Sequence, residues 1–158
     1  MAQQRIDSAM SVAGHPIHPT MIHFPVAMLL AATASDAAYI FTGDFFWARA
    51  SVWLVGIGAL GGWAAGLVGT IELLLVRAIR RLVTAWNHAV LAVVTLSLAT
   101  FNWMLRIDDP ALLVNPWGIY MSLLTTAMIL LTSMQGGQLV YEYAVGVNIE
   151  SEPEPNRP

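Results

Sequence analysis

The sequence predicts an all-α integral membrane protein, built as an up-down bundle of four helices. Hydrophobic residues make up 57% of the 158-residue chain and charged residues only 11%. A soluble domain usually has about 25% charged residues. Four windows of the sequence are mostly apolar, and each reaches the roughly 20 residues that a helix needs to cross a membrane. Short polar or glycine-containing turns separate these windows.

The first expected span covers residues 20–41. Pro19 fits the first helical position, where a missing N–H costs no hydrogen bond. Pro25 falls within the first two turns and is expected to kink the entry of the helix. Asp36 lies near the far end, and the turn at residues 42–44 follows.

The second expected span covers residues 46–77. Three glycines recur on one face at intervals of four residues, namely Gly58, Gly62 and Gly66. This spacing lets membrane helices approach closely, so we expect the glycine face to pack against another helix. The alternative is that glycine is simply frequent in membrane helices.

The third span is expected at residues 82–105, and the fourth begins at Asn115-Pro116 and ends near Gly137. The predicted domain organisation has three parts. Residues 1–19 form an N-terminal segment with a His-Pro loop, residues 20–147 form the transmembrane domain, and residues 148–158 form an acidic, disordered tail.

Arginine asymmetry predicts the orientation. In a four-span topology, one side of the membrane holds both termini and the central turn, with Arg5, Arg77, Arg80, Arg81 and Arg157. The other side holds only Arg49 and Arg106. The positive-inside rule then places both termini in the cytoplasm.

Several classes of function are excluded or disfavoured by composition. The chain has no cysteine, which rules out disulfides, iron–sulfur clusters and covalent haem attachment within it. A net charge of -3 gives no reason to expect nucleic-acid binding. No inverted repeat indicates a transporter, and no residue pattern identifies a substrate, so a non-enzymatic protein is favoured.

Five polar residues converge on one leaflet in the predicted topology: His15, His18, His23, Glu72 and His88. The two histidines of the N-terminal segment precede the first span, and His23 lies in its first turns. Glu72, taken here as the one deep carboxylate, lies about two turns before the second span ends, and His88 about two turns into the third. Ionisable residues inside a membrane are costly and typically functional.

Three chemistries suit this set. A b-type haem would be held by paired axial imidazoles, with His23 and His88 as the expected pair and His18 able to replace His23. Arg77, Arg80 or Arg81 would then meet the propionates. A bare zinc, copper, nickel or iron ion would take ligands from His15, His18, His23, Glu72 and His88. A proton or ion relay is the third option.

A purely structural explanation stands beside these three. Histidines near a membrane surface can cap helices, bond lipid headgroups or bridge neighbouring helices through hydrogen bonds. Glu72 would then be neutralised by Arg77 or by a histidine.

The motif Gly14-His15-Pro16-Ile17-His18-Pro19, followed by Ile22-His23-Phe24-Pro25, resembles the opening signature of a bacterial membrane family called domain of unknown function 2231. The resemblance continues through Glu72 after its glycines, Trp86-Asn87-His88, Asn102-Trp103 to Arg106, and Gly136-Gly137 to Val147. It covers roughly residues 14–147. The chain departs from the pattern at Tyr143 and Ala144, where a histidine and a glycine are usual, and at Glu72, where aspartate is common.

The resemblance implies a location in the bacterial cytoplasmic (inner) membrane. Related proteins are joined to, or encoded near, Rieske and c-type cytochrome domains, which implies membrane electron transfer with a separate redox partner. The expected function is therefore a small cytochrome b-like or metal-binding protein that passes electrons. The alternative is a non-catalytic accessory subunit of a larger membrane complex, assembled with other membrane proteins or with copies of itself.

Overall fold

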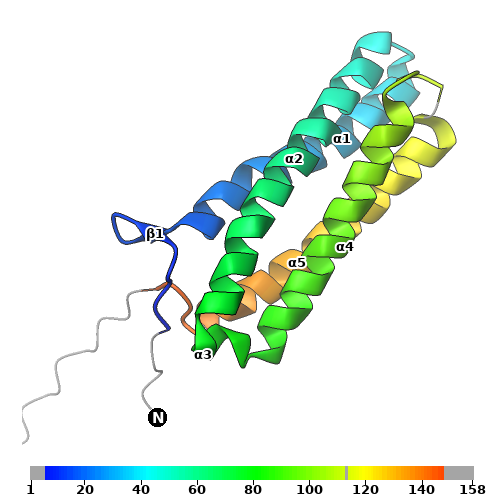
Figure 1. The fold of residues 1–158 in the computed structure, drawn as a ribbon. Helices are drawn as coiled ribbons and strands as arrows, with labels where there is room; N and C mark the ends of the chain where they lie inside the picture. The colour runs from blue at the N-terminus through cyan, green and yellow to red at the C-terminus, as the bar shows by residue number, and fades with distance from the viewer. Residues whose placement is uncertain (1–5, 113, 148–158) are drawn as a thin grey trace, which may run out of the picture.

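The computed structural model describes residues 6–112 and 114–147. Four long helices run up and down beside one another (Figure 1): α1 (Ile17–Thr42), α2 (Phe45–Leu75), α4 (Val83–Arg106) and α5 (Ile119–Tyr141). All four are long and apolar enough to cross a membrane, the last counted from Val114. The predicted all-α membrane bundle is confirmed.

Short elements complete the two ends of the bundle. The hairpin of β1 (Ser11–Val12) and β2 (His15–Pro16) precedes α1, and α3 (Arg77–Arg80) joins α2 to α4 at the same end (Figure 1). At the opposite end, η1 (Val114–Gly118) leads into α5. The predicted tail at residues 148–158 lies outside the described residues.

The start of α1 differs from the prediction in a way that matters for the site. The helix begins at Ile17, with Pro16 in extended conformation as its N-cap, so Pro19 still falls in the first turn, where its missing N–H costs nothing. His18 therefore belongs to the helix and not to the preceding loop. Pro25 is buried inside α1, which continues through it as one helix.

The connections at the opposite end follow local backbone chemistry. Gly43 adopts a left-handed φ of 69°, and Asp44 accepts a hydrogen bond from the Phe46 amide at 2.9 Å, which confirms the predicted turn. The fourth span counts from Val114, close to the predicted start, but its regular α-helix, α5, begins only at Ile119, because Asn115 is extended (φ -116°, ψ 120°).

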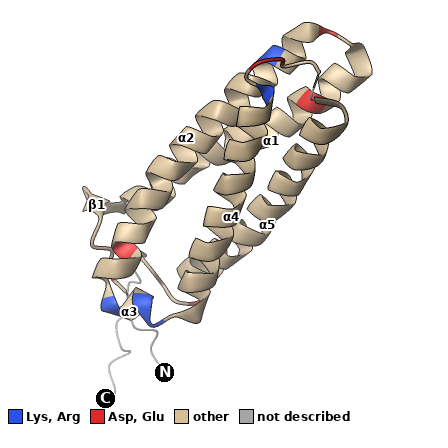
Figure 2. Cartoon of the chain, turned by 45° about the vertical axis from the view of Figure 1, so that its right-hand side comes forward, with Lys and Arg blue, Asp and Glu red and all other residues tan. Residues whose placement is uncertain are grey.

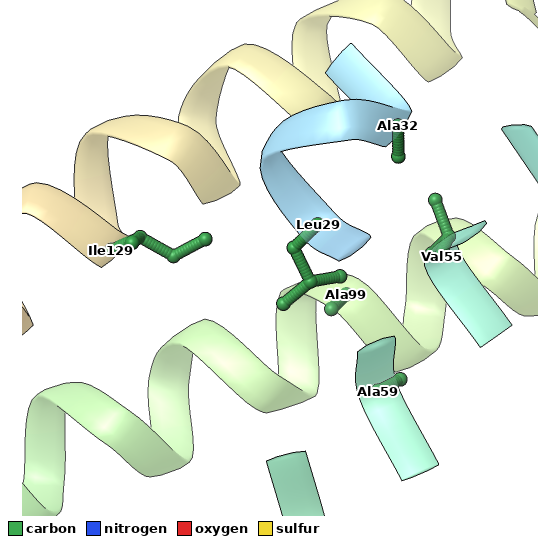
Figure 3. Packing of buried hydrophobic residues seen from close by; sticks show 6 residues of the cluster. All are labelled: Leu29, Ala32, Val55, Ala59, Ala99 and Ile129. Atoms are coloured by element: carbon green, nitrogen blue, oxygen red, sulfur yellow. The ribbon is translucent and has the colours of Figure 1, made fainter. Parts of the chain in front are cut away.

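Small side chains let the helices pack closely. One apolar layer takes its members from all four long helices (Figure 3): Leu29, Ala32, Val55, Ala59, Ala99 and Ile129. A Cβ added at Gly58 would lie 2.7 Å from Leu29 Cγ of α1, and one at Gly62 would collide with Leu96 of α4. The predicted glycine face thus packs against two neighbouring helices.

The outside of the bundle is apolar along most of its length. Large hydrophobic side chains are exposed on each long helix, including Leu30, Leu60, Leu67, Val90 and Leu130. Charged residues gather instead at the two ends (Figure 2). This distribution suits helices surrounded by lipid, with the charged ends in the interfacial layers.

Candidate functional site

His18 is held against α2 near the α3 end of the bundle. Its Nδ1 lies 2.8 Å from the carbonyl oxygen of Ala65. One turn further along α2, a Cβ added at Gly69 would lie only 2.9 Å from the same Nδ1. The imidazole therefore occupies the space that a larger residue at Gly69 would need.

His88 repeats this arrangement on the other helix pair. From the second turn of α4, its Nδ1 lies 3.0 Å from the carbonyl oxygen of Thr132 on α5. A Cβ added at Gly136, one turn further along α5, would lie 3.2 Å from His88 Cε1. Each histidine is thus bonded to one carbonyl and seated beside one glycine of a neighbouring helix.

The two rings lie in contact, and we call them the histidine pair. Their centroids are 6.2 Å apart and their planes meet at 86°. A carbonyl oxygen only accepts hydrogen bonds, so in each contact Nδ1 is the donor, which leaves Nε2 as the ring nitrogen that can bind a metal. A backbone carbonyl that fixes one ring nitrogen in this way is the usual second-shell partner of a metal-ligating histidine.

The other two histidines lie elsewhere. His23 is exposed, five residues after His18 on α1 and so on a different face of the helix. His15 is exposed in β2, with its Nδ1 3.0 Å from the Ala13 carbonyl oxygen. In the part of the chain that the structure describes, no group of three or more histidine or acidic side chains is arranged to hold a metal ion. The ring contact joins His88 to His18, the replacement partner considered from the sequence.

Glu72 lies one turn beyond Gly69 on α2. Its side chain is 7% exposed, and its Oε1 has no hydrogen-bond partner among the described residues. The expected neutralising partner, Arg77, is exposed on α3. Arg81 is exposed directly after α3, while Arg80 donates from Nη1 to the Leu74 carbonyl at 2.8 Å. The arginines proposed for propionates therefore lie at the same end as the histidine pair.

A second polar group, at the opposite end, was not predicted. Arg106 at the end of α4 forms a two-pronged ion pair with Asp36 of α1, with Nη1–Oδ1 at 2.5 Å and Nη2–Oδ2 at 2.8 Å. Both side chains are 0% exposed. The expectation that Glu72 is the one deep carboxylate is therefore wrong, because Asp36 is buried more completely.

Three more polar residues complete this network, which we call the arginine cluster: Asp36, Ser51, Asn102, Arg106 and Ser122. Arg106 Nε donates to Asn102 Oδ1 at 2.9 Å, and Ser122 Oγ donates to Asp36 Oδ2 at 2.6 Å. Ser51 bonds both charged partners. The cluster thus ties all four long helices together.

The distance of polar residues from the turn between the first two spans indicates part of this cluster. Asp36 lies six residues before α1 ends and Ser51 six residues after α2 begins. Both are therefore about 9 Å along the helix axis from the same turn. Counting polar residues by depth from each turn would have paired them, whereas the reach of Arg106 back into the bundle has no sequence signal.

Comparison with known proteins adds one result. No curated protein and no solved structure matches the chain. A family model described as "Predicted membrane protein (DUF2231)" matches residues 14–149, a range that includes both polar groups and every long helix. The chain therefore belongs to the DUF2231 family of predicted membrane proteins.

Proposed function

We propose that this membrane protein binds a b-type haem between His18 and His88 and passes electrons within the membrane. The observation that supports the proposal is the histidine pair itself, in which imidazoles of α1 and α4 lie with their centroids 6.2 Å apart. Metal–imidazole bonds are about 2 Å long, so an iron held between two facing rings separates their centres by about 6 Å.

The residues around the pair fit a haem better than a bare ion. Haem iron takes four ligands from its porphyrin and needs only two from the protein, whereas structural zinc takes about four protein ligands. His18 and His88 supply two, each fixed through Nδ1 by a backbone carbonyl. A bare zinc, copper, nickel or iron ion would also require Glu72, His15 or His23 to move toward the pair.

Two further features support the same site. Gly69 and Gly136 have no side chain beside the two rings, which lets each imidazole lie against the backbone of a neighbouring helix, where a carbonyl fixes its orientation. Arg77 and Arg81 are exposed at this end of the bundle and are suited to pair with propionates. A bound haem would supply a one-electron redox couple, and the surrounding apolar helices would limit water around it. The electron donor and acceptor would be other redox proteins.

The test is optical. Full-length protein, purified in detergent from haem-replete cells, is measured as a reduced-minus-oxidised visible spectrum, with metal content taken from the same sample. We expect a sharp reduced α-band and one iron per chain. His18→Ala and His88→Ala should each abolish the band while the protein still inserts. His15→Ala and His23→Ala are matched controls, exposed histidines of the same end, and should keep it.

The other outcomes are equally specific. Loss of the band in His23→Ala but not in His18→Ala would replace His18 by His23 as the ligand. Colourless protein with stoichiometric zinc, copper or nickel would replace haem by a bare metal site. Colourless, metal-free protein would overturn the proposal and leave an accessory subunit, in which the polar groups serve helix packing and assembly.

A further inference from the structure

A groove of about 330 Å³ lies along the first turns of α2, at the end of the bundle away from the histidine pair. It is lined by Phe45, Phe46, Arg49, Ala50 and Trp53. These residues share one face of the helix, since their successive positions are separated by one or three residues. The groove is thus a feature of the helix surface and not of the bundle interior.

The large aromatic side chains that line this groove are exposed on the outside of the bundle. The side chain of Phe46 is 61% exposed and that of Trp53 is 69% exposed. Phe46 packs edge-to-face on Trp47, with ring centroids 5.1 Å apart, which fixes the wall nearest the helix start. Aromatic side chains at the end of a membrane helix typically lie at the level of lipid headgroups and glycerol.

Arg49 gives the groove a positive charge that is not paired with any described residue. Within residues 6–112 and 114–147, no hydrogen bond or ion pair engages its guanidinium. Asp44, five residues earlier, uses its Oδ1 to cap α2 by accepting from the Phe46 amide. Arg106, the other arginine of this end, is neutralised by Asp36. At the same end, Asp109 accepts hydrogen bonds from the Ala111 and Leu112 amides. The guanidinium of Arg49 is therefore free to pair with an anion from outside the protein.

We propose that this groove binds an anionic phospholipid, with Arg49 on the phosphodiester and one acyl chain along Trp53 and Ala50. Arg49 lies one turn inside α2, about 6 Å from its start, and a side chain of this length reaches the headgroup layer from that depth. The planar guanidinium matches two phosphate oxygens at once. The site is independent of the histidine pair, so it stands whether or not haem binds.

Lipid binding can be measured on the full-length protein by native mass spectrometry, from vesicles with equal amounts of phosphatidylglycerol and phosphatidylcholine. We expect phosphatidylglycerol to be retained preferentially. Arg49→Gln should weaken that binding about five-fold, the effect of one basic residue at an anionic surface, and Arg49→Lys should keep most of it. Equal retention of the two lipids by the unmodified protein, or unchanged retention in Arg49→Gln, would overturn the proposal.

A matched pair of tryptophans tests the position of the acyl chain. Trp53→Leu removes the far wall of the groove, whereas Trp117→Leu changes a tryptophan of η1 that is 61% exposed at the same end of the bundle. We expect only Trp53→Leu to reduce phosphatidylglycerol retention. Equal losses from both substitutions would indicate general contact with the bilayer and would overturn a specific site at Arg49.

Discussion

The two ends of the bundle differ in whether their buried polar groups have hydrogen-bond partners. In the arginine cluster, Arg106 and Asp36 are fully buried, and partners from all four helices satisfy them. At the histidine end, the rings are half-buried, and Glu72 has a buried oxygen without a partner. A fully satisfied buried network rigidifies a fold, whereas unsatisfied groups are expected where a ligand binds. We therefore expect the first end to hold the helices together and the second to be the end where a ligand binds.

An apolar layer separates the two ends. Leu29, Ala59, Ala99 and Ile129 belong to one buried cluster to which all four long helices contribute (Figure 3). Hydroxyl pairs flank this layer, with Thr33 and Thr126 at 2.8 Å toward the arginine cluster and Thr95 and Thr132 at 3.3 Å toward the histidine pair. Since distant sites without shared partners usually contribute additively, changes at one end should leave the other intact.

The largest effect is expected from Asp36→Ala. This substitution leaves the Arg106 guanidinium buried without its counter-charge, which should cost about 3–5 kcal/mol of unfolding free energy. The measurement is an unfolding titration of the purified protein in mixed micelles. The double variant Asp36→Leu with Arg106→Leu is the control, because it removes both charges and should be less destabilised than the single variant. A cost below about 1 kcal/mol for Asp36→Ala would show that the cluster does not hold the helices.

The sequence predicts the two ends of the bundle to different extents. The four spans follow from hydropathy and turn residues, and the end that carries the histidines follows from counting residues within each span. The ring pairing does not follow, because α1 starts at Ile17 instead of residue 20 and this moves His18 into the helix. Only a residue inside the helix has a fixed direction, and His18 then lies about 140° around the helix from His23. Which of the two faces the bundle depends on how α1 packs, so span prediction alone cannot tell which histidine faces inward.

The contact of Arg106 within the arginine cluster was beyond sequence reasoning for a different reason. Arg106 stands at the last position of α4, where an arginine usually marks the membrane surface. Its side chain instead reaches inward, to an aspartate 70 residues earlier in the chain. Such a contact depends on how the helices are rotated about their axes, which is decided by packing of small residues such as those at Gly58 and Gly62.

A smaller effect is expected from Gly69→Ala, which disturbs the histidine end alone. The added Cβ would lie 2.9 Å from His18 Nδ1, and the ring cannot yield without losing its bond to Ala65. We expect an overpacking cost of about 2 kcal/mol and a matching loss of haem content in the visible spectrum.

Gly66→Ala is the matched control for this substitution, one turn away on the same helix. Its Cβ would meet Leu96 Cδ1 at an ordinary 3.6 Å, so stability should be unchanged or raised by up to about 1 kcal/mol. Haem content should stay the same. If both variants lose haem equally, the loss reflects packing of α2 and the His18 ring is not the cause.

The smallest effect, and the one of opposite sign, is expected from Glu72→Leu. Glu72 buries a carboxylate oxygen without a hydrogen-bond partner among the described residues, and an unsatisfied buried polar group costs about 1–3 kcal/mol. Leucine has a similar volume and no polar atom in its side chain, so the unfolding free energy should rise by about 1 kcal/mol. Removal of the Asp36 carboxylate, in contrast, should lower it. A loss of stability as large as that of Asp36→Ala would show that Glu72 also stabilises the fold. A gain in stability would mean that the fold does not require this carboxylate. A role in binding would then be the physical reason for a destabilising residue at this position.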